Sequence, residues 1–332
     1  MLRDEVRFVL IVGLEYPQAI EVEAGDRING LAFTANGEHL VSGGWEGVQV
    51  WRVKDGERQA TMKVGIVWSV AVSKDGRFIA AGSSLGDVFI WDGMTYEQVF
   101  ADKIPGRPTI HDVDFSPDST RLVSANEWHC TATIWDVSGA RKLKVQTLDH
   151  GLYWVLAAKY SPQGDRIATA SDKSVRVWDS NDGQLLVDVN VGLKPRRGLL
   201  WFDNHLFYKT DNSKIKRIDA FTGSTVSEWL VPHDDYSWFA LPQHGQFIAY
   251  STEDNITFWD TLTHTQLGLI PRSSKRGPIT FSLNDRIAIV AQEKKIIINT
   301  LSLVKVSPVF FQYLPVREHV SLSHTQGAGH PY

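Results

Sequence analysis

The stretch from Asp149 to Asp179 contains the side chains with the clearest potential for chemistry. It holds an imidazole at His150, a hydroxyl at Thr169 and a carboxylate at Asp172. An indole follows at Trp178, 28 residues after the histidine. A hydroxyl, an imidazole and a carboxylate are the groups of a nucleophilic triad, in which the imidazole takes the proton of the attacking hydroxyl. They are also groups that satisfy one another in a buried hydrogen-bond network.

Other patterns that carry chemistry are weak or missing in this sequence. Glu127, His129 and Cys130 adjoin one another, but no second ligand cluster stands at the spacing of a metal site. Cys130 is the single cysteine, so the chain has no CxxC motif and no internal disulfide. The sequence also lacks the G-x-x-x-x-G-K-[ST], H-E-x-x-H and G-x-S-x-G motifs. We therefore expect no metal, no cofactor and no enzymatic activity.

The elements around the four side chains are short strands. Two alternating apolar runs, Leu156 to Tyr160 and Arg166 to Ala170, flank a turn at Ser161 to Gly164. A third run, Val175 to Trp178, follows a polar turn at Ser171 to Ser174. This pattern predicts three antiparallel strands joined by tight turns.

This unit recurs along the chain. The tryptophan that ends its third strand returns at positions 51, 91, 135 and 259, and Ile218 and Asn299 stand in the same place in two weaker copies. The spacing is 40 to 44 residues, so we count seven units. A fourth strand follows the third, for example at Gln184 to Val189, and each unit is thus predicted to be a four-stranded antiparallel meander. Such units protect their faces and edges when they close into a ring.

Repeats of this length, with third strands that end in Ile-Trp-Asp or Val-Trp-Asp, resemble the WD40 family. The resemblance covers roughly residues 18 to 302 and implies an all-β fold, a seven-bladed WD40 β-propeller of four-stranded antiparallel blades. Within the family, the chain is similar to expanded fungal WD40-repeat proteins, some of which carry the propeller behind a nucleotide-binding NLR-like module. The phrases that carry the resemblance are Phe89-Ile90-Trp91-Asp92, Thr133-Ile134-Trp135-Asp136, Val175-Arg176-Val177-Trp178-Asp179 and Thr257-Phe258-Trp259-Asp260.

The resemblance also decides how the first four side chains are interpreted. In this family a histidine, a serine or threonine, an aspartate and a tryptophan form a hydrogen-bond network within a blade. By position, His150, Thr169, Asp172 and Trp178 match that set. We therefore predict a structural network and not a catalytic triad.

The ring needs one more strand to close. Gln18 to Glu23 alternates like a fourth strand, and Val304 to Phe311 is a competing segment in which Pro308 removes one hydrogen-bond donor. We favour the N-terminal segment. Residues 1–17 are expected to form an extension that adds an edge strand, residues 18–311 the propeller, and residues 312–332 a disordered tail.

Two features suggest a binding surface on the upper face, which carries the loops between blades and the turns between second and third strands. Aromatic and polar side chains are expected around the mouth of the central channel: Asn29, Trp68, His111, Trp128 and Trp154. The same face over the last three units is basic, which suggests an acidic or phosphorylated peptide as a partner. The basic residues are Lys194, Arg196, Arg197, Lys214, Arg272, Lys275, Arg276, Lys294 and Lys295.

Composition limits the remaining classes of partner. The 332 residues carry a net charge of −4 with a pI near 6.3, which gives no general attraction to nucleic acid or an anionic membrane. No apolar run approaches the 18 residues or so of a membrane span, and a single cysteine suits the cytoplasm or nucleus. We predict a monomeric, non-enzymatic scaffold that binds a protein or peptide. A ligand-sensing propeller related to NLR-like receptors and a propeller that binds a small ligand or glycan are the alternatives.

Overall fold

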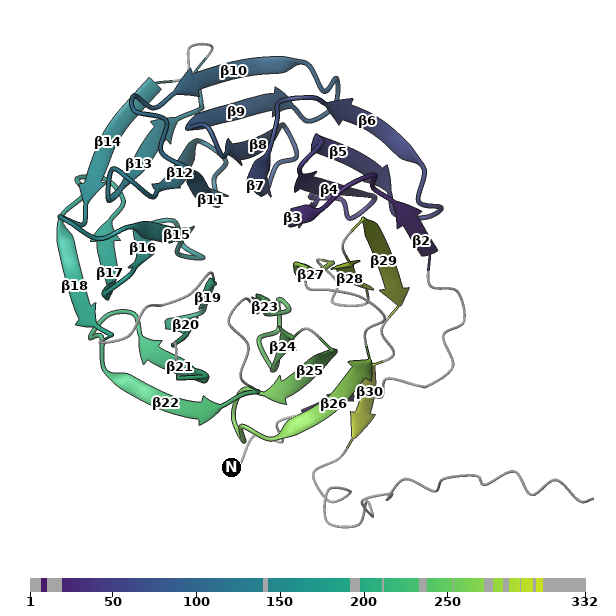
Figure 1. Cartoon of the computed structure of the whole chain (residues 1–332). Coiled ribbons are helices and arrows are strands. Elements are labelled where there is room, and N and C mark those ends of the chain that lie inside the picture. Colours follow the sequence, from purple (N-terminus) through teal and green to yellow (C-terminus); the bar gives the residue numbers. More distant parts are fainter. Residues whose placement is uncertain are drawn as a thin grey trace, which may run out of the picture.

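The computed structural model of the chain is a ring of small β-sheets (Figure 1). It describes residues 7–10, 20–139, 143–191, 198–210, 212–232, 238–252, 254–271, 277–282, 287–292, 294–300 and 303–306. Within these residues every regular element is a strand, and all strand pairs are antiparallel. None of them forms a helix with the length and apolarity needed to cross a membrane.

Six blades of the ring are each built from four consecutive strands. Blade 1 contains β3 (Ile28–Phe33), β4 (His39–Gly44), β5 (Gly47–Arg52) and β6 (Arg58–Met62). Blade 2 contains β7 (Val67–Val72), β8 (Phe78–Ser83), β9 (Asp87–Asp92) and β10 (Gln98–Lys103). Blade 3 contains β11 (Ile110–Phe115), β12 (Arg121–Asn126), β13 (Thr131–Asp136) and β14 (Leu143–Asp149).

The other three blades continue around the ring in the same way. Blade 4 contains β15 (Val155–Tyr160), β16 (Arg166–Ser171), β17 (Ser174–Asp179) and β18 (Leu185–Asn190). Blade 5 contains β19 (Leu199–Phe202), β20 (His205–Lys209), β21 (Lys214–Asp219) and β22 (Thr225–Leu230). Blade 6 contains β23 (Trp238–Ala240), β24 (Phe247–Ser251), β25 (Asn255–Asp260) and β26 (Gln266–Pro271).

The remaining four-stranded sheet has a different origin. It joins β27 (Ile279–Phe281), β28 (Ile287–Gln292) and β29 (Lys295–Thr300) to β2 (Ile20–Glu23), which comes from the other end of the chain. The prediction of seven four-stranded repeat blades is therefore corrected to six, because this sheet does not come from one repeat. We call it the composite sheet.

The composite sheet closes the ring, because it pairs a strand from the start of the repeat region with strands from its end. Ile20 is paired with Ile298 and Glu23 with Lys295, and the Ala24 amide donates to the Lys294 carbonyl over 2.6 Å. The preference for the N-terminal segment as the closing strand is thus confirmed. Its competitor overlaps β30 (Leu303–Val306), which pairs with β1 (Arg7–Leu10) in a separate two-stranded sheet. Residues 312–332 lie outside the described residues.

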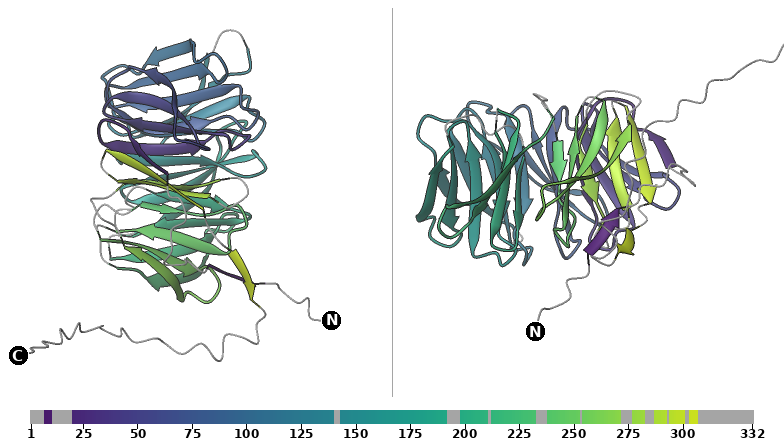
Figure 2. Two further views of the ribbon diagram at one scale, coloured as in Figure 1. Left: turned by 90° about the vertical axis from the view of Figure 1, so that its right-hand side faces the viewer. Right: turned by 90° about the horizontal axis from the view of Figure 1, so that it is seen from below.

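The core lies between neighbouring blades. Trp135 at the end of the third strand of blade 3 packs among residues of blade 2, and Trp178 of blade 4 packs among residues of blade 3. Apolar side chains on both faces of the inner strands are buried, as expected of sheets that are stacked on both sides. Figure 2 shows these blades from the side, stacked around the ring. The stacking brings the first strand of each sheet to the inside of the ring.

Candidate functional site

The centre of the ring holds a cavity of about 320 Å³. Residues of all seven innermost strands line it, because the first strand of each four-stranded sheet faces the centre (Figure 1). Asn29, Trp68, His111 and Leu156 are among these residues. The structure thus brings together four side chains that the repeat pattern places at corresponding positions.

A β-bulge in each of four blades aims these side chains at the channel. The strand register shifts between Ile28 and Gly30 in blade 1, and equivalent shifts occur in blades 2, 3 and 4. The residue inside each shift is among those that line the cavity. A bulge inserts one residue and redirects its side chain, so the four positions share a backbone cause.

The four bulge residues differ in their surroundings. Asn29 is buried, and its amide donates to the Val67 carbonyl of blade 2 over 2.9 Å, so it ties two blades together. The rings of Trp68 and His111 lie 5.8 Å apart at 47°. His111 Nε2 lies 3.0 Å from a carboxylate oxygen of Glu127, and its Nδ1 atom has no hydrogen-bond partner among the described residues. Trp68 and His111 are therefore better placed than Asn29 to meet a ligand.

One wall of the channel is polar and is held by an ion pair. Asp112 accepts hydrogen bonds from the Ser69 hydroxyl at 3.0 Å and from the Lys159 ammonium at 2.9 Å. These contacts join blades 2, 3 and 4. Burial alone lowers the pKa of Lys159, but the attraction of Asp112 and Asp114 outweighs it and raises that pKa above the ordinary value. Burial raises the pKa of Asp114 to about 6.

The opposite wall is apolar and aromatic. Leu199, Trp238, Phe239 and Ile279 line the cavity from blades 5 and 6 and the composite sheet. A cavity with one charged wall and one aromatic wall suits an amphipathic group.

The upper face carries a second candidate site, an exposed apolar patch over blades 3 and 4. The patch consists of Trp128, Leu152 and Trp154, whose exposed fractions are 70%, 89% and 45%. Large apolar side chains gathered at the surface are typical of binding sites. We call these three residues the upper-face patch.

Backbone hydrogen bonds hold the loops of the patch together. The His150 amide donates to the Cys130 carbonyl over 2.9 Å, and the Asp172 amide donates to the Trp154 carbonyl over 3.2 Å. His129 Nε2 lies 2.6 Å from the Pro105 carbonyl oxygen. The patch is therefore held by four connected loops and turns, which lowers the entropy lost when a partner binds.

The basic upper rim has little support in the described residues. Lys214 pairs with Glu228, and Lys295 pairs with Glu21 and Glu23, so carboxylates of the same sheet compensate both charges. Arg196, Arg197, Lys275 and Arg276 lie outside the described residues. The acidic-partner hypothesis stays a prediction.

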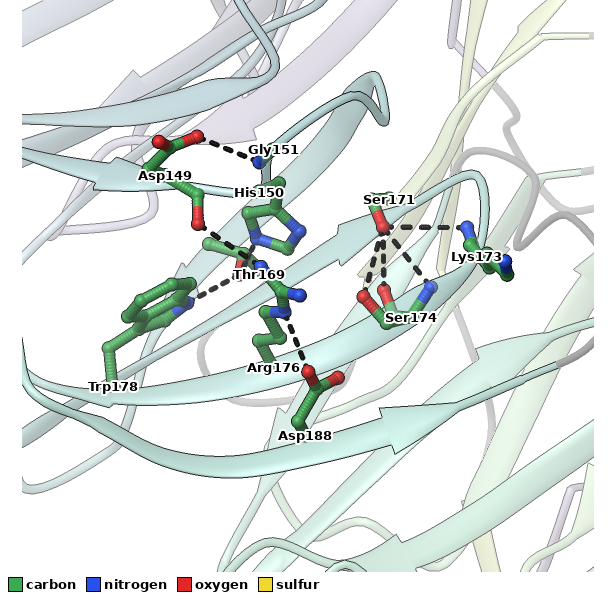
Figure 3. A network of polar contacts seen from close by, with 10 residues as sticks. All are labelled: Asp149, His150, Gly151, Thr169, Ser171, Lys173, Ser174, Arg176, Trp178 and Asp188. Carbon is green, nitrogen blue, oxygen red and sulfur yellow. Dashed lines mark hydrogen bonds and ion pairs between the residues drawn. The ribbon is translucent and has the colours of Figure 1, made fainter.

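Three members of the predicted network form hydrogen bonds in blade 4 (Figure 3). The Thr169 hydroxyl lies 2.6 Å from His150 Nε2 and accepts a hydrogen bond from the Trp178 indole over 2.7 Å. Burial lowers the pKa of His150 to about 3, so the imidazole is neutral at ordinary pH. His150 Nδ1 has no hydrogen-bond partner within the described residues, and the role predicted for Asp172 beside it stays a prediction.

Sequence reasoning missed the polar wall of the channel. Lys159 interrupts the apolar run of its strand, and Asp112 and Asp114 alternate with apolar residues. Each of these charged residues is also compatible with a strand whose one face is exposed to solvent, so none of them alone indicated a polar channel wall. The ion pair depends on which strands become neighbours. Leu152 of the upper-face patch was missed because an apolar loop residue has no motif around it.

Comparisons with known proteins agree with the architecture. The family model described as "WD domain, G-beta repeat" matches residues 56–92, 101–136 and 142–179. Three segments of the chain thus match WD40 repeats. The third matched segment runs from the fourth strand of blade 3 through the third strand of blade 4, so a sequence repeat spans two blades and links them covalently.

The relatives of the chain are distant and cover only part of it. The Small ribosomal subunit protein RACK1y of Oryza sativa subsp. japonica is 28% identical over 42% of this chain and 43% of its own length. The Apoptotic protease-activating factor 1 of Mus musculus is 28% identical over 44% of this chain, which is 11% of its own length. The chain thus matches less than half of either relative.

A solved structure supports the fold. The β-propeller domain of Cps50 (Swd1) from Myceliophteria thermophila superposes with a TM-score of 0.76. It covers 87% of this chain and 99% of that domain at 13% identity. At this identity the likeness concerns the fold alone.

Proposed function

We propose that the chain is a non-enzymatic scaffold that binds a protein or peptide through the upper-face patch and the adjoining channel mouth. The observation that carries the proposal is the exposure of Trp128, a residue that is 70% exposed at the tip of a hydrogen-bonded turn. A tryptophan exposed at such a tip contributes little to folding. It contributes much to binding when a partner covers it, because tryptophan is prominent among the residues that dominate interface energies.

The neighbouring side chains make the surface larger. Leu152 and Trp154 lie in the loop that joins blades 3 and 4, and the turn of Trp128 is hydrogen-bonded to the start of that loop through Cys130 and His150. A tryptophan buries about 150 to 250 Å² when fully covered. Two tryptophans and a leucine on connected loops can form the apolar centre of a small interface, which polar residues surround.

The test is affinity capture with a matched control. The triple variant Trp128→Ser, Leu152→Ser and Trp154→Ser removes the upper-face patch. The control, Met94→Ser with Leu262→Ser, removes apolar side chains that are 86% and 57% exposed on turns at the opposite face. Proteins that bind the wild type and the control but not the triple variant support the proposal. Equal binding to all three contradicts it.

The chemistry of the partner, the relation to NLR-like receptors and the cellular location are each tested by a separate experiment. An acidic or phosphorylated partner for the basic rim predicts that reversing Arg196, Arg197, Lys275 and Arg276 weakens binding of that partner. A relation to NLR-like receptors predicts a nucleotide-binding module encoded upstream in the same locus. Residence in the cytoplasm or nucleus, proposed from the single buried Cys130, is checked by imaging a fluorescent fusion.

A further inference from the structure

Blade 5 breaks the repeat pattern at a core position. The third strand of each unit ends near a tryptophan or its equivalent, and the residue just before it is apolar and at most 5% exposed in the other blades and the composite sheet. These residues are Val50, Ile90, Ile134, Val177, Phe258 and Ile298. In blade 5 the same position holds Arg217, and the residue opposite it on β22 is Ser227. An arginine in place of a buried aliphatic residue costs stability unless its charge is compensated.

The structure shows no such compensation by a described carboxylate. Arg217 lies with its guanidinium 5.6 Å from the centre of the Phe207 ring and 3.2 Å from a ring nitrogen of His205. Its Nε atom is buried without a hydrogen-bond partner, and so are the Ser227 hydroxyl and the Trp229 indole nitrogen. Three buried donors thus gather on one face of blade 5 with no acceptor.

Blade 6 also departs from the repeat pattern, at a turn residue that contacts blade 5. The turn between the third and fourth strands has a residue with positive φ, which is glycine at positions 56, 183 and 223 and tyrosine at position 96. In blade 6 it is His264, with a φ of 59°. A residue other than glycine in this conformation costs about 1 kcal/mol or more. The His264 ring stacks on Trp229 of blade 5, with centroids 4.5 Å apart at 15°.

The nearby carboxylates are engaged elsewhere or exposed. Asp219 accepts hydrogen bonds from the amides of Phe221 and Thr222, and Asp260 accepts them from those of Leu262 and Thr263. Glu228 lies on the other face of β22, where it pairs with Lys214 and Lys216. Asp203 is exposed and acts on Arg217 only at a distance. The cluster is therefore rich in donors and short of negative charge.

We propose that Arg217, His205 and His264 form a binding site for a phosphate group at the lower edge of the interface between blades 5 and 6. Arg217, Ser227 and both histidines are partly exposed, so the cluster is reached from the surface. A phosphate accepts several hydrogen bonds at once and pairs well with a guanidinium. When the His264 ring moves off Trp229, the phosphate also reaches the buried donors. This site is independent of the upper-face patch.

The electrostatics of the cluster agree with the assignment. Burial is the largest effect on both histidines and lowers the pKa of His205 and His264. Asp203 and Asp219 raise the first and Asp260 raises the second, whereas the Arg217 charge lowers both. Burial also lowers the pKa of Arg217. A bound dianion reverses these effects, so both histidine pKa values are expected to rise when phosphate binds.

The variants that test this site restore the pattern of the other blades. Arg217→Ile returns the core position to an aliphatic residue, and His264→Gly returns the turn to glycine, so both variants are expected to fold. Arg52→Gln is the control, because Arg52 is an exposed arginine already paired with Asp55 and Glu57. Thermal unfolding is measured with inorganic phosphate in one arm and phosphoserine in the other.

Inorganic phosphate at ten times its dissociation constant is expected to raise the folded-to-unfolded ratio of the wild type and of Arg52→Gln about elevenfold. Arg217→Ile and His264→Gly keep only the general stabilisation by phosphate as a salt, which acts on all variants alike. A response to phosphoserine as well means that the site takes phosphate esters; a response to phosphate alone restricts it to the free ion. The same response in Arg217→Ile as in the wild type, or wild-type His205 and His264 resonances that do not move with phosphate, overturns the proposal.

Discussion

Replacing Thr169 by valine tests whether the network of blade 4 is structural. The substitution keeps the volume and the branched shape of a side chain that is fully buried. It removes one hydroxyl, which lies 2.6 Å from His150 Nε2 and 2.7 Å from Trp178 Nε1. Both nitrogens then lack a partner in a region that water does not reach.

The cost follows from counting those two groups. A buried polar group left without its hydrogen bond destabilises a protein by about 1 to 3 kcal/mol. Two such groups give an expected loss of about 2 to 6 kcal/mol, a large part of the stability of an ordinary domain, which is about 5 to 15 kcal/mol. Shape and apolar burial are conserved, so packing adds little to this loss.

Urea denaturation followed by circular dichroism measures the loss. Thr147→Val is the control, because Thr147 is an exposed residue on β14, and its replacement is expected to change the free energy of unfolding by no more than about 0.5 kcal/mol. If Thr169→Val were as stable as Thr147→Val, the network would not be a source of stability. The hydroxyl, imidazole and carboxylate would then need another explanation.

Three further predictions concern pH, the channel and the closure of the ring. Because the His150 pKa is lowered from 6.5 to about 3, the unfolded chain takes up its proton first, and the wild type should lose about 2 to 3 kcal/mol more than His150→Gln between pH 6.5 and pH 4.5 in urea titrations. Asp112→Ala leaves Lys159 without its closest carboxylate and should lower the free energy of unfolding by about 3 kcal/mol, whereas the double variant Asp112→Leu with Lys159→Met should recover most of it. Val22→Ser weakens the packing of the closing strand by about 1 kcal/mol and should speed hydrogen exchange of the β29 amides; unchanged exchange would argue against closure by β2.

The sequence was sufficient to predict the strands and the closing segment because both depend on local patterns. Alternating apolar runs and turn residues recur at each unit, and β2 alternates in the same way. The count of repeat blades was wrong by one because the last three strands take their partner from the opposite end of the chain.

The candidate sites could be predicted only in part. Trp68 and His111 were predicted at the channel mouth because they occupy corresponding positions in their repeats, and the structure places both at a bulge that lines the cavity. Their role in binding stays a prediction. The ion pair between Asp112 and Lys159 could not be found, because it joins strands of two blades that are neighbours only in the closed ring. Arg217 lies in a repeat that has also lost its tryptophan. From the sequence alone, the arginine is therefore compatible with a further loss of the repeat motif, because the residues around it in the fold are not known.

The most direct test of the proposed scaffold is the affinity of one captured partner for two single variants. Trp128→Ser removes the most exposed tryptophan of the upper-face patch, and Met94→Ser removes an even more exposed side chain on the opposite face. We predict that Trp128→Ser raises the dissociation constant at least tenfold, which corresponds to about 1.4 kcal/mol, and that Met94→Ser leaves it unchanged. An unchanged dissociation constant for Trp128→Ser, or an equal increase for both variants, would contradict binding at the upper face.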